Sequence, residues 1–183
     1  MAYESFYWRN LIRRDLVYLS KKMKMKHHEV EANIDEHFSY VEIKIMTTAY
    51  ALRKLADTHK LPDITLNKLV KAQIYRRKVS EPPRAYGDME KEFDFNTRKA
   101  GTIKLRDLCN QIIHSYIFQA MGSRTKAFNS FFVVSDYSRN KYVYEVSLST
   151  FIKATNWAIN SYVTNATAKY NTKLGKWIYE SKN

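Results

Sequence analysis

Apolar residues recur every three or four positions over four long stretches of this sequence, and this spacing predicts amphipathic helices. The stretches cover residues 5–25, 29–59, 105–120 and 150–163. Thr102 is the expected N-cap of the third helix, and Gly122 is placed where a C-terminal cap would end it. Glycine (4) and proline (3) are both scarce, which disfavours a barrel or sandwich built from many tight turns.

Residues 128–148 follow a different pattern, in which two apolar runs flank the polar segment 135–141. The second run alternates, which predicts a β-hairpin with a polar tip. Two strands alone are marginally stable, so the hairpin must lie on the helices or pair with another strand. We therefore expect a mainly α fold of the α+β kind: a bundle of four to five helices with a β-hairpin insertion near 128–148, in a single domain over residues 1–183.

Three segments are harder to assign. Residues 64–78 suit a helix or a strand, and we expect a short helix. Residues 79–101 contain two adjacent prolines and little periodicity, which predicts a long loop, either a lid over the 105–120 helix or a poorly ordered connection. The tail 169–183 holds several aromatic residues, which we expect to dock on the body.

The chain is strongly basic: 31 lysines and arginines against 18 acidic residues give a net charge of +13, and the isoelectric point is near 9.7. A charge of this size attracts RNA, DNA or an acidic membrane surface. Nucleic acid, RNA rather than DNA, is the expected partner, and a basic protein with no such partner is the alternative. The candidate phosphate contacts are Lys21, Lys22, Lys24, Lys26, Arg76, Arg77, Lys78, Arg98, Lys99, Lys104, Arg139 and Lys141.

Cysteine usage and the N-terminus bear on the compartment. Cys109 is the only cysteine, so no intrachain disulfide can form and no oxidising compartment is implied. The first residues lack the basic and apolar regions of a signal peptide, and no stretch is apolar enough to span a bilayer. A cytoplasmic protein without a membrane partner is expected. Neither a metal site nor a cofactor is expected, because no histidine or cysteine spacing suits zinc.

A polar stripe follows the predicted 105–120 helix. Arg106, Asn110 and His114 recur four residues apart, which places them along one side of a helix that drifts away from its apolar face. An imidazole near its ordinary pKa exchanges protons at neutral pH, as cleavage of RNA through the 2′-hydroxyl requires. An arginine can neutralise the developing charge on the phosphate, and an amide can orient the imidazole. The buried side of the same helix is expected to hold Cys109 as a small hydrophobe.

The segment Cys109-Asn110-Gln111-Ile112-Ile113-His114 resembles the motif of HEPN domains. In that family an arginine is followed by a polar residue, commonly asparagine, and then by a histidine about one turn further on. Asn110 and His114 match the last two, Cys109 stands where the family has arginine, and the nearest arginine is Arg106. The resemblance covers one helix. It implies a small helical bundle that acts as a homodimer.

The resemblance also implies a metal-independent ribonuclease of a bacterial or phage conflict system, such as a toxin–antitoxin or antiviral defence system. His114 would then be the general acid and base, Arg106 the phosphate clamp and Asn110 the orienting residue. The missing family arginine leaves an alternative open. In it the chain is a non-catalytic RNA-binding or DNA-binding module, or a protein-binding adaptor, with a degenerate HEPN-like site. Whether the chain is an enzyme is left open at this point.

Overall fold

The computed structural model describes residues 2–79, 81 and 88–182, with the backbone alone at residues 2–4 and 176. The helices are α1 (Ala2–Lys22), α2 (Ile34–Asp57), α3 (Met89–Glu92), α4 (Leu105–Ile113) and α5 (Leu148–Ile159). The strands are β1 (Leu69–Arg76), β2 (Lys99–Lys104), β3 (Ser115–Met121), β4 (Ser130–Ser135), β5 (Tyr142–Ser147), β6 (Asn165–Asn171) and β7 (Lys176–Lys182). None of the helices in this described part is long and apolar enough to cross a membrane.

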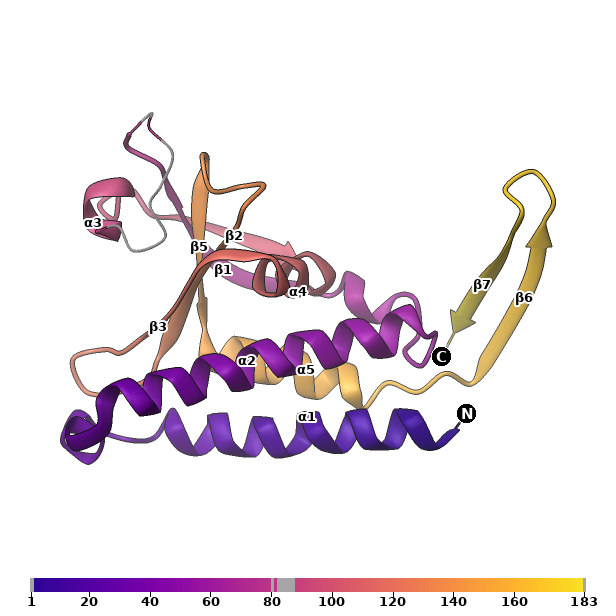
Figure 1. Cartoon of the computed structure of the whole chain (residues 1–183), viewed down its shortest axis with the longest axis horizontal. Helices are drawn as coiled ribbons and strands as arrows, with labels where there is room; N and C mark the ends of the chain where they lie inside the picture. The colour runs from indigo at the N-terminus through magenta and orange to yellow at the C-terminus, as the bar shows by residue number, and fades with distance from the viewer. Residues whose placement is uncertain (1, 80, 82–87, 183) are drawn as a thin grey trace.

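Strands β1 to β5 form one antiparallel sheet in the order β2-β1-β5-β4-β3, and β6 pairs only with β7 (Figure 1). The chain is therefore α+β, and the predicted bundle of helices with a hairpin insertion is wrong. The hairpin predicted within 128–148 does form, as β4 and β5. It is not an insertion, because its two strands lie inside the five-stranded sheet.

Two segments predicted as helical are strands, and this difference overturns the predicted bundle. Residues 69–76 form β1, which lies between β2 and β5, whereas a short helix was expected over 64–78. The predicted 105–120 helix ends at Ile113, and the chain continues as the edge strand β3. Thr102 lies in β2 and Lys104 occupies the N-cap position, so neither Thr102 nor Gly122 caps the helix.

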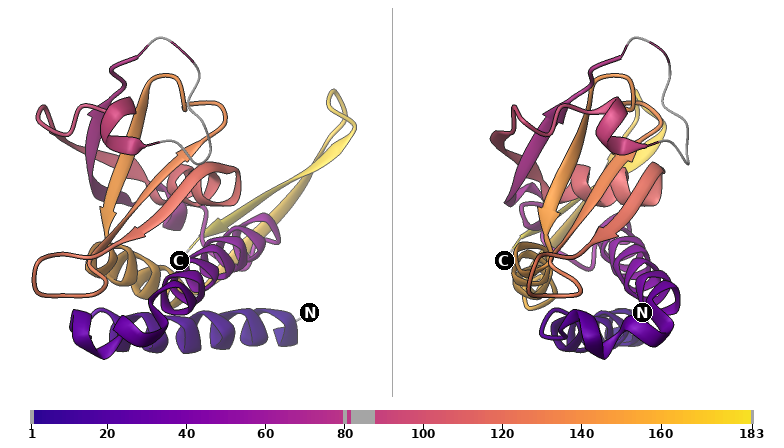
Figure 2. Two further views of the ribbon diagram at one scale, coloured as in Figure 1. Left: turned by 60° about the vertical axis from the view of Figure 1, so that its left-hand side comes forward. Right: turned by 90° about the vertical axis from the view of Figure 1, so that its left-hand side faces the viewer.

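Helices α1, α2 and α5 pack against one another at one end of the sheet (Figure 2). Their positions agree with the predicted stretches, except that residues 27–33 form two 3-10 turns before α2. Two buried charged side chains fix this layer. Asp15 of α1 accepts hydrogen bonds from Lys44 at 2.9 Å and from Thr47 at 2.8 Å on α2. Arg9 donates to the carbonyl oxygens of Ile159, Lys60 and Ser161.

The two faces of the sheet meet different partners. One face packs Phe131 and Val133 with the buried residues of α4 and α5 in the main core. The opposite face packs Phe132 and Val134 around Phe93, which is fully buried. The described residues 88–98 of the predicted loop therefore cover the face opposite to α4 and do not form a lid over that helix. Residues 80 and 82–87 of that loop lie outside the described part of the chain.

The C-terminal tail forms a hairpin, β6–β7, that extends away from the rest of the molecule (Figures 1 and 2). We refer to residues 165–182 as the arm. Its base is held by Ser181, whose backbone and hydroxyl bond to Asp63 and Leu61. The tail aromatics were expected to dock on the body. Tyr179 does contact the ring of His59, with centroids 4.7 Å apart, but Tyr170 and Trp177 are exposed further along the arm.

Candidate nucleic-acid interface

Helix α4 forms one wall of an open groove of about 980 Å³, here called the α4 groove. The helix is amphipathic: Leu105, Leu108, Cys109 and Ile112 are buried, and the residues between them face outward. Asn110 and His114 both line the groove. The helix ends as it reaches His114, whose backbone N–H donates to the carbonyl oxygen of Asn110 at 3.0 Å.

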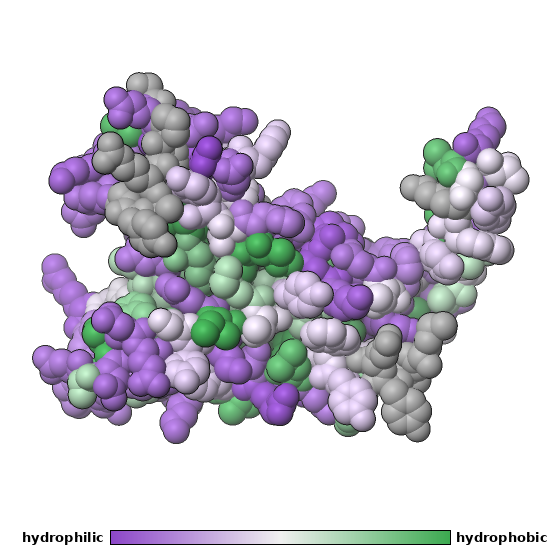
Figure 3. All heavy atoms as spheres, in the orientation of Figure 1, coloured by the Kyte–Doolittle hydropathy of each residue, from purple (hydrophilic) through white to green (hydrophobic). Residues whose placement is uncertain are grey.

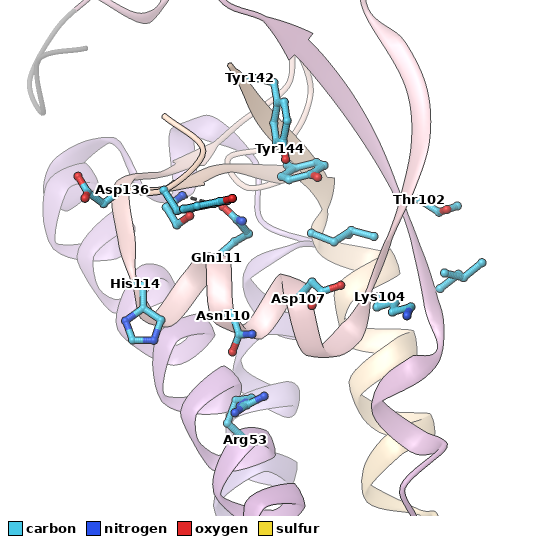
Figure 4. A pocket seen from close by; sticks show the side chains of 14 residues that line it. Arg53, Thr102, Lys104, Asp107, Asn110, Gln111, His114, Asp136, Tyr142 and Tyr144 are labelled. Carbon is cyan, nitrogen blue, oxygen red and sulfur yellow. Dashed lines mark hydrogen bonds between the residues drawn. The ribbon is translucent and has the colours of Figure 1, made fainter. Parts of the chain in front are cut away.

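The side chains of Asn110 and His114 are available to a ligand. His114 is exposed and Asn110 is partly exposed. Within the described part of the chain, neither the His114 ring nor the Asn110 amide has a hydrogen-bond partner. Figure 4 shows the two side chains projecting from the same side of α4, one turn apart. Of the predicted polar stripe, these two residues are therefore brought together in one groove.

Arg106, the third member of the predicted stripe, does not line the groove. Its guanidinium lies 3.7 Å from the carboxylate of Asp57 on α2. Arg53, also on α2, lines the groove instead and lies beneath Asn110 in Figure 4. Arg53 bonds Asp57 as well, at 3.2 Å, and keeps a partly exposed side chain. No local pattern in the sequence points to Arg53, because the packing of α2 on α4 brings it to the groove.

Two tyrosines of β5 border the groove on its other side. Tyr142 and Tyr144 are two residues apart on a strand, so they share one face of the sheet. Their rings contact each other with centroids 5.0 Å apart, and both are partly exposed (Figure 4). Burial, and then the neighbouring phenol of Tyr142, raise the pKa of Tyr144. Tyr144 is therefore neutral at physiological pH, where its hydroxyl can donate a hydrogen bond.

The strand register places two predicted phosphate contacts on the same face as these tyrosines. Tyr142 pairs with Arg76 of β1, and Tyr144 pairs with Ile74, which in turn pairs with Lys99 of β2. Directly paired residues of antiparallel strands point to the same face, about 5 Å apart at Cβ. Arg76 and Lys99 are both exposed. We call Tyr142, Tyr144, Arg76 and Lys99 the tyrosine platform.

Two other basic candidates of this region have structural partners. The Arg77 guanidinium is almost completely buried, where it pairs with Glu92 at 3.4 Å and donates to nearby backbone carbonyls. Lys78 donates to the carbonyl oxygen of Glu90 at 3.1 Å. The buried Arg77 is therefore removed from contact with a ligand, whereas Lys78 remains exposed.

The turn between β4 and β5 holds two further candidates. Arg139 pairs with Asp136 at 2.8 Å, and its guanidinium lies over the ring of Tyr116. The ammonium of Lys141 lies 5.6 Å from the ring centre of Tyr137, which is 88% exposed. Asp136 and Tyr137 both line the α4 groove, so this turn forms one end of it.

The remaining basic candidates divide between the groove and other surfaces. Lys104 lines the α4 groove, whereas Arg98 lines a hollow beside Lys71 and Glu145. The four lysines near the end of α1 are not in the groove lining; they are Lys21, Lys22, Lys24 and Lys26. Lys22 is buried, and its ammonium contacts the ring nitrogen of His37 at 2.8 Å. Burial lowers the pKa of Lys22, and Lys21 lowers it further.

Other residues of α4 support the groove. Gln111 accepts hydrogen bonds from the backbone N–H of Ser135, at 2.7 Å, and from the hydroxyl of Ser138, at 2.9 Å. It therefore holds the β4–β5 turn against the helix.

Burial raises the pKa of the Cys109 thiol to about 12, and a thiol that stays protonated is unsuited to nucleophilic chemistry. Across the described residues, no group of three or more His, Cys, Asp or Glu side chains is placed to hold a metal ion.

Comparisons with protein-family models, with curated proteins and with solved structures find no match to this chain. The side chains of the groove are therefore what indicates a function. The groove combines an arginine, a lysine, an unpaired amide, an exposed imidazole and two tyrosines whose rings meet edge to face. Such a set can hold a phosphate backbone and stack against bases.

Proposed function

We propose that this chain binds single-stranded RNA across the tyrosine platform and the α4 groove. The observation that carries the proposal is the placement of Tyr142 and Tyr144 on one sheet face, with Arg76 paired to Tyr142 and Lys99 on the same face one strand beyond Ile74. Unpaired bases stack on exposed aromatic rings, while nearby cations neutralise the phosphates. The net charge of +13 adds a long-range attraction for any polyanion.

The opposite wall of the groove gives a reason to prefer RNA to DNA. Asn110 and His114 present polar groups without protein partners, and Arg53 lies beside them. A 2′-hydroxyl both donates and accepts hydrogen bonds, so groups of this kind can distinguish a ribose from a deoxyribose. An RNA partner also agrees with the expected cytoplasmic location. The proposal thus assigns base stacking to the platform and sugar recognition to α4.

Fluorescence anisotropy with a labelled single-stranded RNA tests the platform. Tyr142→Leu and Tyr144→Leu keep apolar volume but remove the aromatic face, so each is expected to weaken binding by about 1–3 kcal/mol, roughly 5- to 150-fold. Tyr7→Leu is the matched control, because Tyr7 is exposed on α1 away from the groove. Equal affinities for all three variants and the parent chain would contradict the proposal.

The salt dependence of the same binding tests the phosphate contacts. Arg76→Ala and Lys99→Ala should each reduce the slope of log K against log salt by about 0.7, the contribution of one phosphate contact on a single strand. Arg14→Ala, a change at an exposed arginine of α1, should reduce the slope much less. Comparing RNA with DNA of the same sequence, for the parent chain and for Asn110→Ala, tests sugar recognition.

Metal-independent RNA cleavage is a second candidate function. It is favoured by the exposed and unpaired imidazole of His114, one turn from Asn110 in the same groove. For this function Arg53 would bind the phosphate in place of Arg106, because Arg53 is the arginine that lines the groove. Incubation of purified protein with RNA in EDTA, beside His114→Ala, tests it. Cleavage lost in the variant supports an enzyme, while no cleavage by either protein leaves a binding module.

A further inference from the structure

The arm is an amphipathic hairpin with one apolar face. In its register Tyr170 pairs with Trp177 and Ala168 pairs with Tyr179, so these four residues lie on one face. The rings of Tyr170 and Trp177 contact each other with centroids 5.4 Å apart. The alternate pairs, such as Thr167 with Glu180 and Lys169 with Ile178, place mainly polar residues on the other face, where Ile178 is the exception.

The apolar face of the arm is largely exposed in the part of the chain that the structure describes. Trp177 is 56% exposed and Tyr170 is 49% exposed, and the contacts of the arm with the described body are at its base, at Tyr179 and Ser181. A two-stranded hairpin by itself is marginally stable in water. The aromatic face is therefore expected to be covered by another surface, and aromatic residues are typical of interface centres.

Helix α2 carries a second exposed apolar surface, in which the ring of Tyr50 contacts Trp8 of α1 with centroids 6.0 Å apart. Tyr40, Ile43, Met46 and Tyr50 are exposed and recur three or four residues apart, so they form one stripe, here called the α2 stripe. Figure 3 shows hydrophobic residues gathered in the middle of the body, in the region that α2 crosses. The stripe is about 15 Å long from its rise per residue, and each arm strand is about 20 Å long. An arm strand is therefore long enough to span the α2 stripe.

Their charges also match. Residues 27–43 contain five acidic residues and no lysine or arginine, which is unusual in a chain of net charge +13. Asp35 and Glu36 of this segment are exposed at the start of α2, next to the α2 stripe. The arm is basic, with exposed Lys169 and Lys173 towards its tip. Lys169 lies on the face opposite to the aromatic pairs, so its long side chain must pass the edge of the two-stranded ribbon to reach the acidic residues of α2.

We propose that two copies of this chain form a symmetric dimer in which the aromatic face of each arm covers the α2 stripe of the other copy. Two-fold symmetry makes the contact reciprocal. When the arm of one copy lies on the α2 stripe of its partner, the partner's arm lies on the α2 stripe of the first copy. The acidic start of α2 selects the basic arm and opposes other pairings of this cationic chain. This interface does not depend on RNA binding.

Sedimentation equilibrium of the full chain over about 1–100 µM tests the dimer. Trp177→Ser in the arm and Ile43→Ser in the stripe should each weaken dimerisation by about tenfold or more. Ile64→Ser is the matched control, because Ile64 is exposed outside both surfaces, and it should leave the dimer unchanged. Thermal unfolding of each variant by circular dichroism shows that the body is still folded.

A charge exchange gives the sharper test. Asp35→Lys with Glu36→Lys should weaken the dimer, and adding Lys169→Glu with Lys173→Glu to the same chain should restore it. A parent chain that stays monomeric over the whole range, or a charge exchange that fails to restore association, would overturn the proposal. If the arm variants instead lower RNA affinity in a monomeric protein, the arm is a nucleic-acid contact and the dimer is also overturned. RNA binding by a monomer through the platform would leave the proposed function intact.

Discussion

At the residue scale, burial decides the chemistry of the single cysteine. The helical spacing predicted Cys109 as a small buried hydrophobe, and the structure confirms that it is fully buried. Burial raises the pKa of its thiol to about 12, and the charges of Arg53 and Arg106 offset only part of this effect. A neutral thiol reacts slowly, because the thiolate is the nucleophile.

We therefore predict that Cys109 resists a thiol reagent such as a disulfide-forming chromophore at pH 8 in the native protein. In urea the same thiol should react fully, which is the internal control. Rapid modification of the native chain would show that the thiol is accessible and would contradict the burial of this side of α4.

Arg9 is a second residue whose environment leads to a prediction. Its guanidinium is buried and donates to the carbonyl oxygens of Ile159, Lys60 and Ser161, which joins three separate segments. Arg9→Met keeps the length of the side chain but leaves these acceptors without their donor. We expect a loss of about 2–4 kcal/mol in the free energy of unfolding, measured by urea denaturation. Arg14→Met, at an exposed position of α1, should change stability by less than about 0.5 kcal/mol.

At the scale of elements, periodicity predicted the helices better than the strands. The stretches that became α1, α2 and α5 were placed to within a few residues at most ends, because each has one buried face. The helix predicted over 64–78 was wrong because β1 is a central strand, and its partners come from residues far along the chain. Local spacing cannot show such pairing. The predicted 105–120 helix failed at its C-terminal half for the same reason, since pairing with β4 makes residues 115–121 a strand.

Gln111 links two elements, and this leads to a prediction about the β4–β5 turn. Its side-chain oxygen accepts hydrogen bonds from Ser135 and Ser138. Gln111→Leu removes the acceptor and leaves the backbone N–H of Ser135 unpaired, at a cost of about 1–3 kcal/mol. Hydrogen exchange at Ser135 and in the following turn should become faster, as measured by NMR. Asn110→Leu, the neighbouring change at a side chain without a protein partner, should leave that exchange rate unchanged.

At the scale of the whole molecule, the candidate site shows what sequence patterns can and cannot supply. The stripe on α4 correctly grouped Asn110 with His114, since both depend only on helical geometry. Arg106 was grouped with them, yet each step of four residues turns a helix by about 40°, and Arg106 faces Asp57 instead. Arg53 enters the groove from α2, and Arg76 joins Lys99 only through the strand register. These neighbours are products of tertiary packing, which no local pattern contains.

The last prediction concerns Glu42, which joins the helical layer to the sheet. Its carboxylate, on α2, accepts a hydrogen bond at 3.0 Å from the backbone N–H of Ala120 on the edge strand β3. Burial raises the pKa of Glu42 above its ordinary value of 4.5, and the bond from Ala120 offsets only part of this shift. The folded state therefore holds its proton to a higher pH than the unfolded chain does, so this group lowers stability as the pH rises above about 4.5.

Glu42→Gln keeps the acceptor for Ala120 but cannot ionise. Well below pH 4.5 the carboxyl is protonated in both states, so the variant and the parent chain should unfold at similar urea concentrations. As the pH rises through the folded pKa, the parent should lose stability relative to the variant, and the difference should then stay constant. Glu42→Ala, which removes the acceptor, should be less stable than Glu42→Gln at every pH. If the stability difference between the parent chain and Glu42→Gln does not change with pH, the pKa of Glu42 is not raised in the folded state. Burial then does not destabilise the carboxylate that bonds to the edge strand β3.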